Sequence, residues 1–387
     1  MVFQEDFEIE KFMNKHEHNV VYNLGETCCY SMSLKDLEVL TGNKAPLDTI
    51  FNQRLVYGWI EGSDELRDLI CDVYNKDGCA KLVREDVVVT NGAIGANFLT
   101  MYGLVGKGDH VVVVNPTYQQ LQSVPKIFEA EVSLLDLKFE ENWLPNLDAL
   151  QKLVQPNTKM IVINNPNNPT GSVMDNELLL KIVDIARAQD AYLLCDEVYR
   201  PLFHSVAPDK VPDSIVNLYE KGISTCSVSK AFSFAGVRVG WIISRDHAAI
   251  AECITRRDYN TISVSMVDDI IGSYVLQNRN AILKHNYQLC IGNLAILEEF
   301  IQSSNGVLDW VKPAGGTTAF VKINGLVNDN TEDFCDDMAV AYKTLVAPGE
   351  NFNNRGYVRI GFGNSKEDLL TGLPQLKKSL KDKGLWK

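Results

Sequence analysis

The segment Met160-Ile-Val-Ile163, followed by Asn164-Asn-Pro-Asn-Asn-Pro-Thr-Gly171, decides the fold class of this 387-residue chain. Its apolar part has the length of a buried strand, and the segment rich in Asn and Pro ends that strand in a rigid polar loop. A helical pattern follows at 176–189, and a second apolar run, Ala191-Tyr-Leu-Leu-Cys195, comes next. A strand, a helix and another strand in this order are typical of a parallel sheet covered by helices.

The same alternation continues in both directions along the chain. Further apolar runs of strand length lie at 87–90, 110–114, 224–227 and 239–243, with helical stretches between several of them. Most of these runs are continuously apolar, which indicates that both faces of each strand are buried. We therefore expect an α/β protein whose larger part is a mostly parallel sheet between helices.

The ends of the chain have a different pattern. A helical stretch at 278–303, strands at 318–323 and 357–361, and an amphipathic stretch at 366–383 indicate a smaller α+β unit. Pro374 is expected to kink or split any helix in the last stretch. We predict three parts: an N-terminal arm with part of the small domain at 1–48, a large domain at 49–282, and a C-terminal small domain at 283–387.

Composition and charge exclude several classes of protein. The chain is 45% hydrophobic, which argues against intrinsic disorder, and its net charge of −13 argues against binding to nucleic acid or to an anionic membrane. No apolar run approaches the ~20 residues of a membrane span. The nine cysteines contain no CxxC pair, and Cys28 and Cys29 are adjacent, which favours a reducing, cytoplasmic location. His16-Glu-His18 has no accompanying ligands, so we expect a solvated arm there and no metal site.

Polar clusters begin where several of the apolar strands end. In open α/β sheets the ligand binds at the carboxyl ends of the strands, so these clusters are expected to meet in one pocket. The segment 91–97 carries two glycines and either holds a phosphate at a helix N-terminus or forms a simple turn. Tyr118 either stacks on a planar ligand or packs within its own loop. The amides of 164–171 form a third cluster, and they either contact a ligand or form a turn.

Two charged clusters follow the later strands. Asp196 suits a protonated ring nitrogen, although it also suits a helix N-cap, and Tyr199 faces the same pocket if a helical turn begins there. Lys230 follows a strand end, where a confined amine becomes a nucleophile for carbonyl groups; the alternative is a surface lysine. Nearby hydroxyl and guanidinium groups that suit a phosphate come from Ser227, Ser229 and Arg238.

Arg359 lies within an apolar strand pattern, and a buried arginine needs a partner. That partner is either the carboxylate of a substrate or an internal Asp or Glu. A nucleophilic lysine, a carboxylate, a stacking aromatic residue, phosphate donors and a carboxylate-binding arginine together make the set that pyridoxal 5′-phosphate (PLP) requires. Its aldehyde forms a Schiff base with a lysine, and its pyridine nitrogen needs an acidic partner.

The sequence resembles the fold-type I PLP-dependent aminotransferases of class I/II, the aspartate aminotransferase superfamily. The matching motifs extend from Tyr57-Gly-Trp-Ile-Glu-Gly-Ser-Asp-Glu-Leu-Arg67 to Tyr357-Val-Arg-Ile-Gly-Phe362, with 164–171, 196–199 and 227–241 between them in the order of the family. The resemblance implies a seven-stranded, mostly parallel sheet in the large domain and a smaller α+β domain. It also implies a homodimer with shared active sites, and an amino acid and a 2-oxo acid as substrates.

The resemblance implies a role for each matching residue. Lys230 forms the Schiff base and moves the proton between the substrate and the cofactor, with Asp196 and Tyr199 as the other catalytic residues. Asp196 pairs with the pyridine nitrogen, Asn168 and Tyr199 bond the ring 3′-oxygen, and Tyr118 stacks on the ring. The phosphate is held by Gly92, Ala93, Ile94, Ser227, Ser229 and Arg238, and by Tyr57 of the partner subunit. The substrate carboxylate is bound by Arg359, with Gly25 and Asn168 beside it.

The activity implied is transfer of an amino group between an L-amino acid and a 2-oxo acid. A PLP-dependent lyase, cyclase or oxidase is the alternative, because the same cofactor site serves each reaction. The loop at 24–33 departs from the family pattern and leaves the substrate open. A dicarboxylate substrate needs a second cation near the pocket, for which the candidates are Arg54, Arg200, Arg256 and Arg257.

Overall fold

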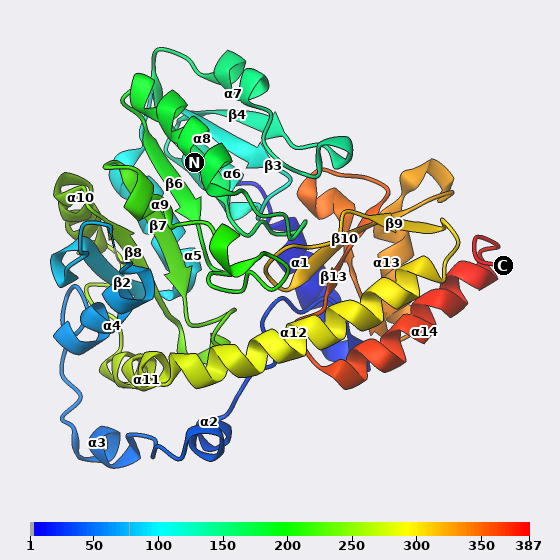
Figure 1. Cartoon of the computed structure of the whole chain (residues 1–387), viewed down its shortest axis with the longest axis horizontal. Coiled ribbons are helices and arrows are strands. Elements are labelled where there is room, and N and C mark those ends of the chain that lie inside the picture. The colour runs from blue at the N-terminus through cyan, green and yellow to red at the C-terminus, as the bar shows by residue number, and fades with distance from the viewer. Residues whose placement is uncertain (1–3, 77) are drawn as a thin grey trace.

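The larger part of the molecule is built around one seven-stranded sheet. The computed structural model describes residues 4–76 and 78–387 (Figure 1). The strand order is β2-β8-β7-β6-β5-β3-β4, and every neighbouring pair is parallel except those that β8 makes with β2 and β7. The strands are β2 (Val87–Asn91), β3 (His110–Asn115), β4 (Glu131–Asp136), β5 (Thr158–Asn164), β6 (Tyr192–Asp196), β7 (Gly222–Ser227) and β8 (Val239–Ser244). The predicted α/β fold with a mostly parallel seven-stranded sheet is confirmed.

Helices cover both faces of this sheet, which explains the continuously apolar strands. In β3, Val111 and Val113 pack into one hydrophobic core, whereas Val112 and Val114 pack into another. The core of Val111 includes α5 (Gly92–Leu104), α6 (Gln120–Ile127) and α10 (His247–Arg257). The core of Val112 includes α4 (Asp64–Tyr74), α7 (Leu147–Leu153), α8 (Asn176–Ala188), α9 (Ile215–Leu218) and α11 (Met266–Gln277).

The smaller unit contains an antiparallel sheet in the order β12-β13-β10-β9. Figure 1 shows the long α12 (Arg279–Gln302) running from beside α11 to this unit, where it lies along α14 (Lys366–Asp382). The strands are β9 (Leu308–Trp310), β10 (Thr318–Ile323), β12 (Ala347–Pro348) and β13 (Tyr357–Gly361), and α13 (Thr331–Ala341) packs against β12. The predicted strands at 318–323 and 357–361 are therefore confirmed.

The N-terminal segment joins the smaller unit through a short parallel pair. β1 (Tyr22–Asn23) pairs with β11 (Thr344–Leu345). Before β1, α1 (Glu8–His16) also contacts β12. After β1, α2 (Leu34–Thr41) and α3 (Leu47–Asn52) lead to the large unit. The domain boundaries near 48 and 282 stay predictions.

The structure corrects two expectations and adds one strand. α14 is one helix that includes Pro374 and is not split there, and its leucines, among them Leu373 and Leu376, are buried. Whether Pro374 kinks the helix stays a prediction. His16 is buried and its Nε2 lies 2.5 Å from Asp336 Oδ1, so it is not part of a solvated arm. The edge strand β4 was not predicted, because it is partly exposed and lacks a continuous apolar run.

None of the helices in the described parts of the chain combines the length and the apolar composition needed to cross a lipid bilayer.

Candidate active site

A cavity of about 480 Å³ lies where the carboxyl ends of the central strands meet the smaller unit. Asn164, Asp196 and Ser227, the last residues of β5, β6 and β7, all line it. The structure brings nearly all of the predicted site residues to this cavity: Gly25, Ala93, Ile94, Tyr118, Asn168, Asp196, Tyr199, Ser227, Ser229, Lys230, Arg238 and Arg359. The expectation that polar clusters at separate strand ends meet in one pocket is confirmed.

One end of the cavity has the properties of an anion site. α5 begins there, and its N-cap residue Asn91 makes no side-chain capping bond, so the first N–H groups of the helix are open to a ligand. Gly92 has φ +75°, and a Cβ at this position would lie 2.7 Å from Nη2 of Arg238. The bare backbone therefore lets the guanidinium approach the helix start. Ser227 and Ser229 complete this group, which suits a phosphate.

Asp196 is buried at the end of β6 and held in place from two sides. Its Oδ2 accepts a hydrogen bond of 2.9 Å from the Asn97 side-chain amide, and its Oδ1 accepts one of 3.0 Å from the Val198 N–H. Burial raises the pKa of Asp196 to about 6, since these bonds only partly offset the loss of water. A carboxylate in this position is suited to pair with a cationic group such as a protonated ring nitrogen.

Lys230 follows β7 and directs its amine into the cavity. Its Nζ donates hydrogen bonds to Thr27 Oγ1 at 2.7 Å and to Cys28 Sγ at 3.4 Å. Burial by itself lowers the pKa of the Lys230 ammonium, but the neighbouring acidic groups Cys28, Tyr199 and Glu26 outweigh it and raise that pKa. Burial also raises the pKa of the Cys28 thiol to about 11, so the thiol is neutral at neutral pH. The lysine is thus not a solvated surface charge.

Arg359 comes from β13 of the smaller unit and is 3% exposed. Its Nη1 donates to Asn168 Oδ1 at 3.3 Å, its Nη2 donates to the Gly25 carbonyl at 3.0 Å, and its Nε has no hydrogen-bond partner. Both of these protein acceptors are neutral oxygens. The internal Asp or Glu that was considered as an alternative partner is therefore absent among the described residues, which favours a carboxylate ligand.

Two predicted residues do not line the cavity. Gly92 lies directly beneath Arg238, so it shapes the phosphate end without forming its surface. Tyr57 lies in the loop after α3, and 81% of its surface is exposed. Its predicted contact with the site of a partner subunit stays a prediction.

The sequence did not assign a role to several residues of the site. Thr27 and Cys28 contact the Lys230 amine, and Asn97 contacts Asp196. The sequence drew attention to the segments of two of these residues. Cys28 lies in the loop that departs from the family pattern, and Asn97 ends the glycine-containing segment. Glu10 of α1 had no such signal; its Oε1 accepts a bond of 2.9 Å from the Tyr118 hydroxyl.

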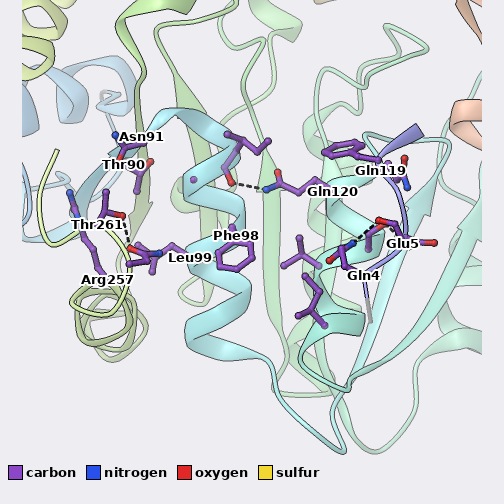
Figure 2. Close-up of a pocket in the computed structure, with 17 residues that line it drawn as sticks. Gln4, Glu5, Thr90, Asn91, Phe98, Leu99, Gln119, Gln120, Arg257 and Thr261 are labelled. Carbon is purple, nitrogen blue, oxygen red and sulfur yellow. Dashed lines mark hydrogen bonds between the residues drawn. The ribbon is translucent and has the colours of Figure 1, made fainter. Parts of the chain in front are cut away.

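A second cavity, of about 390 Å³, lies beside α5, which contributes Phe98 and Leu99 to its lining (Figure 2). Figure 2 shows Phe98 and Leu99 of α5 between Arg257 on one side and Gln119 with the N-terminal segment on the other. Arg257 is 1% exposed, and both of its terminal nitrogens lack a hydrogen-bond partner in the described residues. It does not line the candidate active site.

The set of donors fits PLP. The uncapped N-terminus of α5 and the guanidinium of Arg238 provide for a phosphate, and the buried carboxylate of Asp196 provides for a pyridine nitrogen. Lys230 supplies a primary amine within the same cavity. The fold and the site suit an enzyme that uses this cofactor.

Comparisons with known proteins agree with this class. A family model described as Aminotransferase class I and II matches residues 31–373. The chain is 29% identical to Aspartate aminotransferase of Pyrococcus horikoshii, over 82% of this chain and 81% of that protein. It is 28% identical to Capreomycidine synthase of Streptomyces vinaceus, over 76% of this chain and 74% of that protein.

A solved structure described as a PLP-dependent aminotransferase from Streptococcus suis has a TM-score of 0.91 and 37% identity, and the match covers 98% of both chains. The chain belongs to the class I and II aminotransferase family. It is a PLP-dependent aminotransferase, as its sequence indicated.

Proposed function

We propose that the cavity at the ends of β5, β6 and β7 is the active site and that Lys230 is the residue that carries the cofactor. When bound, PLP supplies an aldehyde for the amine of Lys230 and a ring that accepts the electrons of a breaking Cα–H bond. One observation carries the proposal: the Lys230 amine, the Asp196 carboxylate and the open N-terminus of α5 face one cavity.

The residues of the cavity have separable tasks. With the cofactor bound, the Lys230 Nζ would take the proton from the substrate Cα and pass it to the former aldehyde carbon of the cofactor, and Thr27 orients this nitrogen by accepting a hydrogen bond. Asp196 keeps a ring nitrogen protonated, with Asn97 fixing the carboxylate. Tyr118 covers one face of the ring, and Tyr199 and Asn168 bond its 3′-oxygen.

Each end of the cavity binds an anionic group of the ligand, one through residues of the large unit and the other through a residue of the smaller unit. At the phosphate end, the large unit provides Ala93, Ile94, Ser227, Ser229 and Arg238, with Gly92 beneath them. At the substrate end, Arg359 of the smaller unit binds the α-carboxylate, beside Gly25 and Asn168. The cavity lies between the two units, so the distance between its phosphate end and Arg359 limits the length of the ligand that fits.

We further propose a homodimer in which Tyr57 of the partner subunit reaches the phosphate. Support comes from residues 51–60, at the end of α3 and in the loop after it, where Phe51, Leu55, Val56 and Tyr57 each expose two-thirds or more of their surface. A surface of this kind is typical of an interface. Mixing Lys230→Ala subunits with Tyr57→Ala subunits should restore activity that neither variant has alone. A monomeric enzyme, or mixed dimers without activity, would contradict this.

The substrates are an L-amino acid and a 2-oxo acid, and the location we propose is the cytoplasm. All nine cysteines are free, including Cys29 and Cys290, whose sulfur atoms lie 3.9 Å apart. Such a pair stays reduced in a compartment rich in thiols.

A lyase, cyclase or oxidase reaction is the second candidate, favoured by the similarity to Capreomycidine synthase. The two reactions differ in their need for an acceptor. With an active amino acid, the purified enzyme should convert its bound cofactor from the aldehyde to the amine form, and a 2-oxo acid should reverse the change. These forms are followed by their absorbance. Product formation from an amino acid without any 2-oxo acid would support the second candidate instead.

A further inference from the structure

The helix α1 presents an acidic face to the active-site cavity. Ile9, Glu10, Met13 and Glu17 line the cavity from this helix and the turn that follows it. Residues spaced by three, four and seven positions lie on the same side of a helix, so this is one continuous face. Glu10 and Glu17 stand at its two ends, with Met13 between them.

A third carboxylate, that of Glu26, lines the same cavity. Its Oε1 accepts hydrogen bonds from the N–H groups of Thr27 at 2.6 Å and of Cys28 at 2.8 Å, which hold the carboxylate in place. Although burial raises the pKa of Glu26, the charge of Lys230 and these bonds outweigh it and lower that pKa, so Glu26 is ionised at neutral pH.

Glu26 is already influenced by the charge of Lys230, but no lysine, arginine or histidine of the described residues lies within ion-pair distance of Glu10 or Glu17, and the side-chain partner of Glu10 is the neutral Tyr118 hydroxyl. The ion pairs of α1 are instead made by its other charged residues, as in the contacts of Glu8 with Lys11 and of Lys15 with Asp336. Unpaired carboxylates around a cavity produce a negative potential inside it, which favours a cationic ligand group.

The positively charged residues of the cavity are already assigned to the cofactor and to the α-carboxylate of the substrate. Those that line it are Lys230, Arg238 and Arg359, which serve the cofactor and the α-carboxylate. None of the four arginines considered for a second carboxylate lines the cavity. Arg200 and Arg256 pair with glutamates, Arg257 lines the second cavity, and Arg54 is exposed in the loop after α3. A substrate with an acidic side chain would therefore meet carboxylates and no free cation of this chain.

A second observation points to the ligand independently of the acidic face. Arg359 is almost completely buried and has only neutral oxygens as partners, which leaves it ready to bind a carboxylate. A ligand held at Arg359 by its α-carboxylate directs its side chain into the remainder of the same cavity. The apolar Ile9 and Met13 suit a methylene stem, and the glutamates beside them suit a cationic end.

We propose that the amino donor is an α-amino acid with a cationic side chain, of the lysine, ornithine or arginine type, and that Glu10 and Glu17 select it. This inference rests on the proposed function of the cavity. In the overall reaction the donor Cα is oxidised to a ketone and its amino group passes to the acceptor 2-oxo acid, which is reduced and gives up its keto oxygen. The side-chain cation takes no part in this exchange.

The test compares amino acids of similar shape and different charge on the holoenzyme. Half-reaction rates are measured with arginine against citrulline, lysine against norleucine, and glutamate against glutamine. We expect the cationic member to react with a kcat/KM about tenfold or more above its neutral counterpart, and glutamate to react more slowly than glutamine.

Substitutions of Glu10 and Glu17 then test whether these two glutamates cause the preference for cationic side chains. Glu10→Gln and Glu17→Gln should each reduce kcat/KM for arginine and lysine by about tenfold while changing that for norleucine by less than about threefold. Glu8→Gln removes the same charge from the same helix at a position outside the cavity, so it should leave all of these ratios unchanged.

The outcomes separate the two proposals. A holoenzyme that prefers neutral or acidic side chains, or a cation preference that survives both substitutions, would overturn the inference and leave the proposed function intact. If no amino acid changes the cofactor form and the cofactor is not attached to Lys230, the proposed function fails and the inference fails with it.

Discussion

Replacing Arg359 by methionine should strongly weaken substrate binding without destabilising the fold. The guanidinium is 3% exposed and contacts only neutral oxygens, at 3.0 and 3.3 Å, and the Phe352 ring, whose centroid lies 5.1 Å from Cζ. A substrate carboxylate would add two charge-assisted hydrogen bonds. Their loss should cost about 3 kcal/mol, which corresponds to roughly a 100-fold lower kcat/KM.

The stability of the same variant gives the second half of the test. Removing one partner of a buried ion pair costs about 3–5 kcal/mol, but a buried charge without a carboxylate partner is itself unfavourable, so an apolar replacement should be close to neutral. Arg359→Met should therefore unfold in urea with a free energy within about 1 kcal/mol of the parent.

A matched substrate isolates the role of the carboxylate. The amine derived from the same amino acid by loss of its carboxylate has no group for Arg359 to bind, so its reaction rate should change little in the variant. A large loss of stability, together with an unchanged preference for the amino acid over the amine, would refute the assignment of Arg359.

Three further predictions concern the cofactor end of the cavity and its support. Burial raises the pKa of Asp196 to about 6 in the folded protein without cofactor, above the ordinary value of 3.8, so the folded state binds this proton more tightly. Stability should therefore fall by about 3 kcal/mol as pH rises from about 4 to 7, and urea unfolding of Asp196→Asn should lack this dependence. Glu197 is 1% exposed and pairs with an arginine, so Glu197→Gln should lower the free energy of unfolding by about 3 kcal/mol, whereas Glu177→Gln in an exposed pair should cause no measurable change. Gly92→Ala should weaken PLP binding by roughly tenfold in a cofactor titration, because the added Cβ meets a guanidinium at positive φ, whereas Gly95→Ala, where the nearest atoms are 3.8 Å away, should not.

The large sheet was predictable because its strands are buried on both faces. A run such as His110-Val-Val-Val-Val114 lacks the alternation of polar and apolar residues that a strand or helix with one exposed face would have. β4 was missed for the opposite reason, since it lies at the sheet edge and is partly exposed. The continuity of α14 through Pro374 depends on tertiary packing, which a local rule does not contain.

The site was predictable where its residues follow strand ends and missed where they come from elsewhere. Asp196 and Lys230 follow β6 and β7 in motifs with a chemical meaning, so the topology of the sheet places them together. Glu10 and Glu17 belong to α1 and to the turn that follows it, a segment whose sequence resembles any charged surface helix, and only the folded chain shows that they face the cavity. Tyr57 is a different case, because its predicted role depends on a second subunit.

The central claim, that Lys230 carries PLP, is tested most directly by reduction of the holoenzyme with borohydride followed by peptide mass spectrometry. Reduction fixes the cofactor to the nitrogen that holds it. We predict that the peptide containing Lys230 gains the mass of the reduced cofactor in one-to-one amount, and that Lys230→Ala protein gains none. A label on another lysine, or equal labelling of the parent and the variant, would contradict the account.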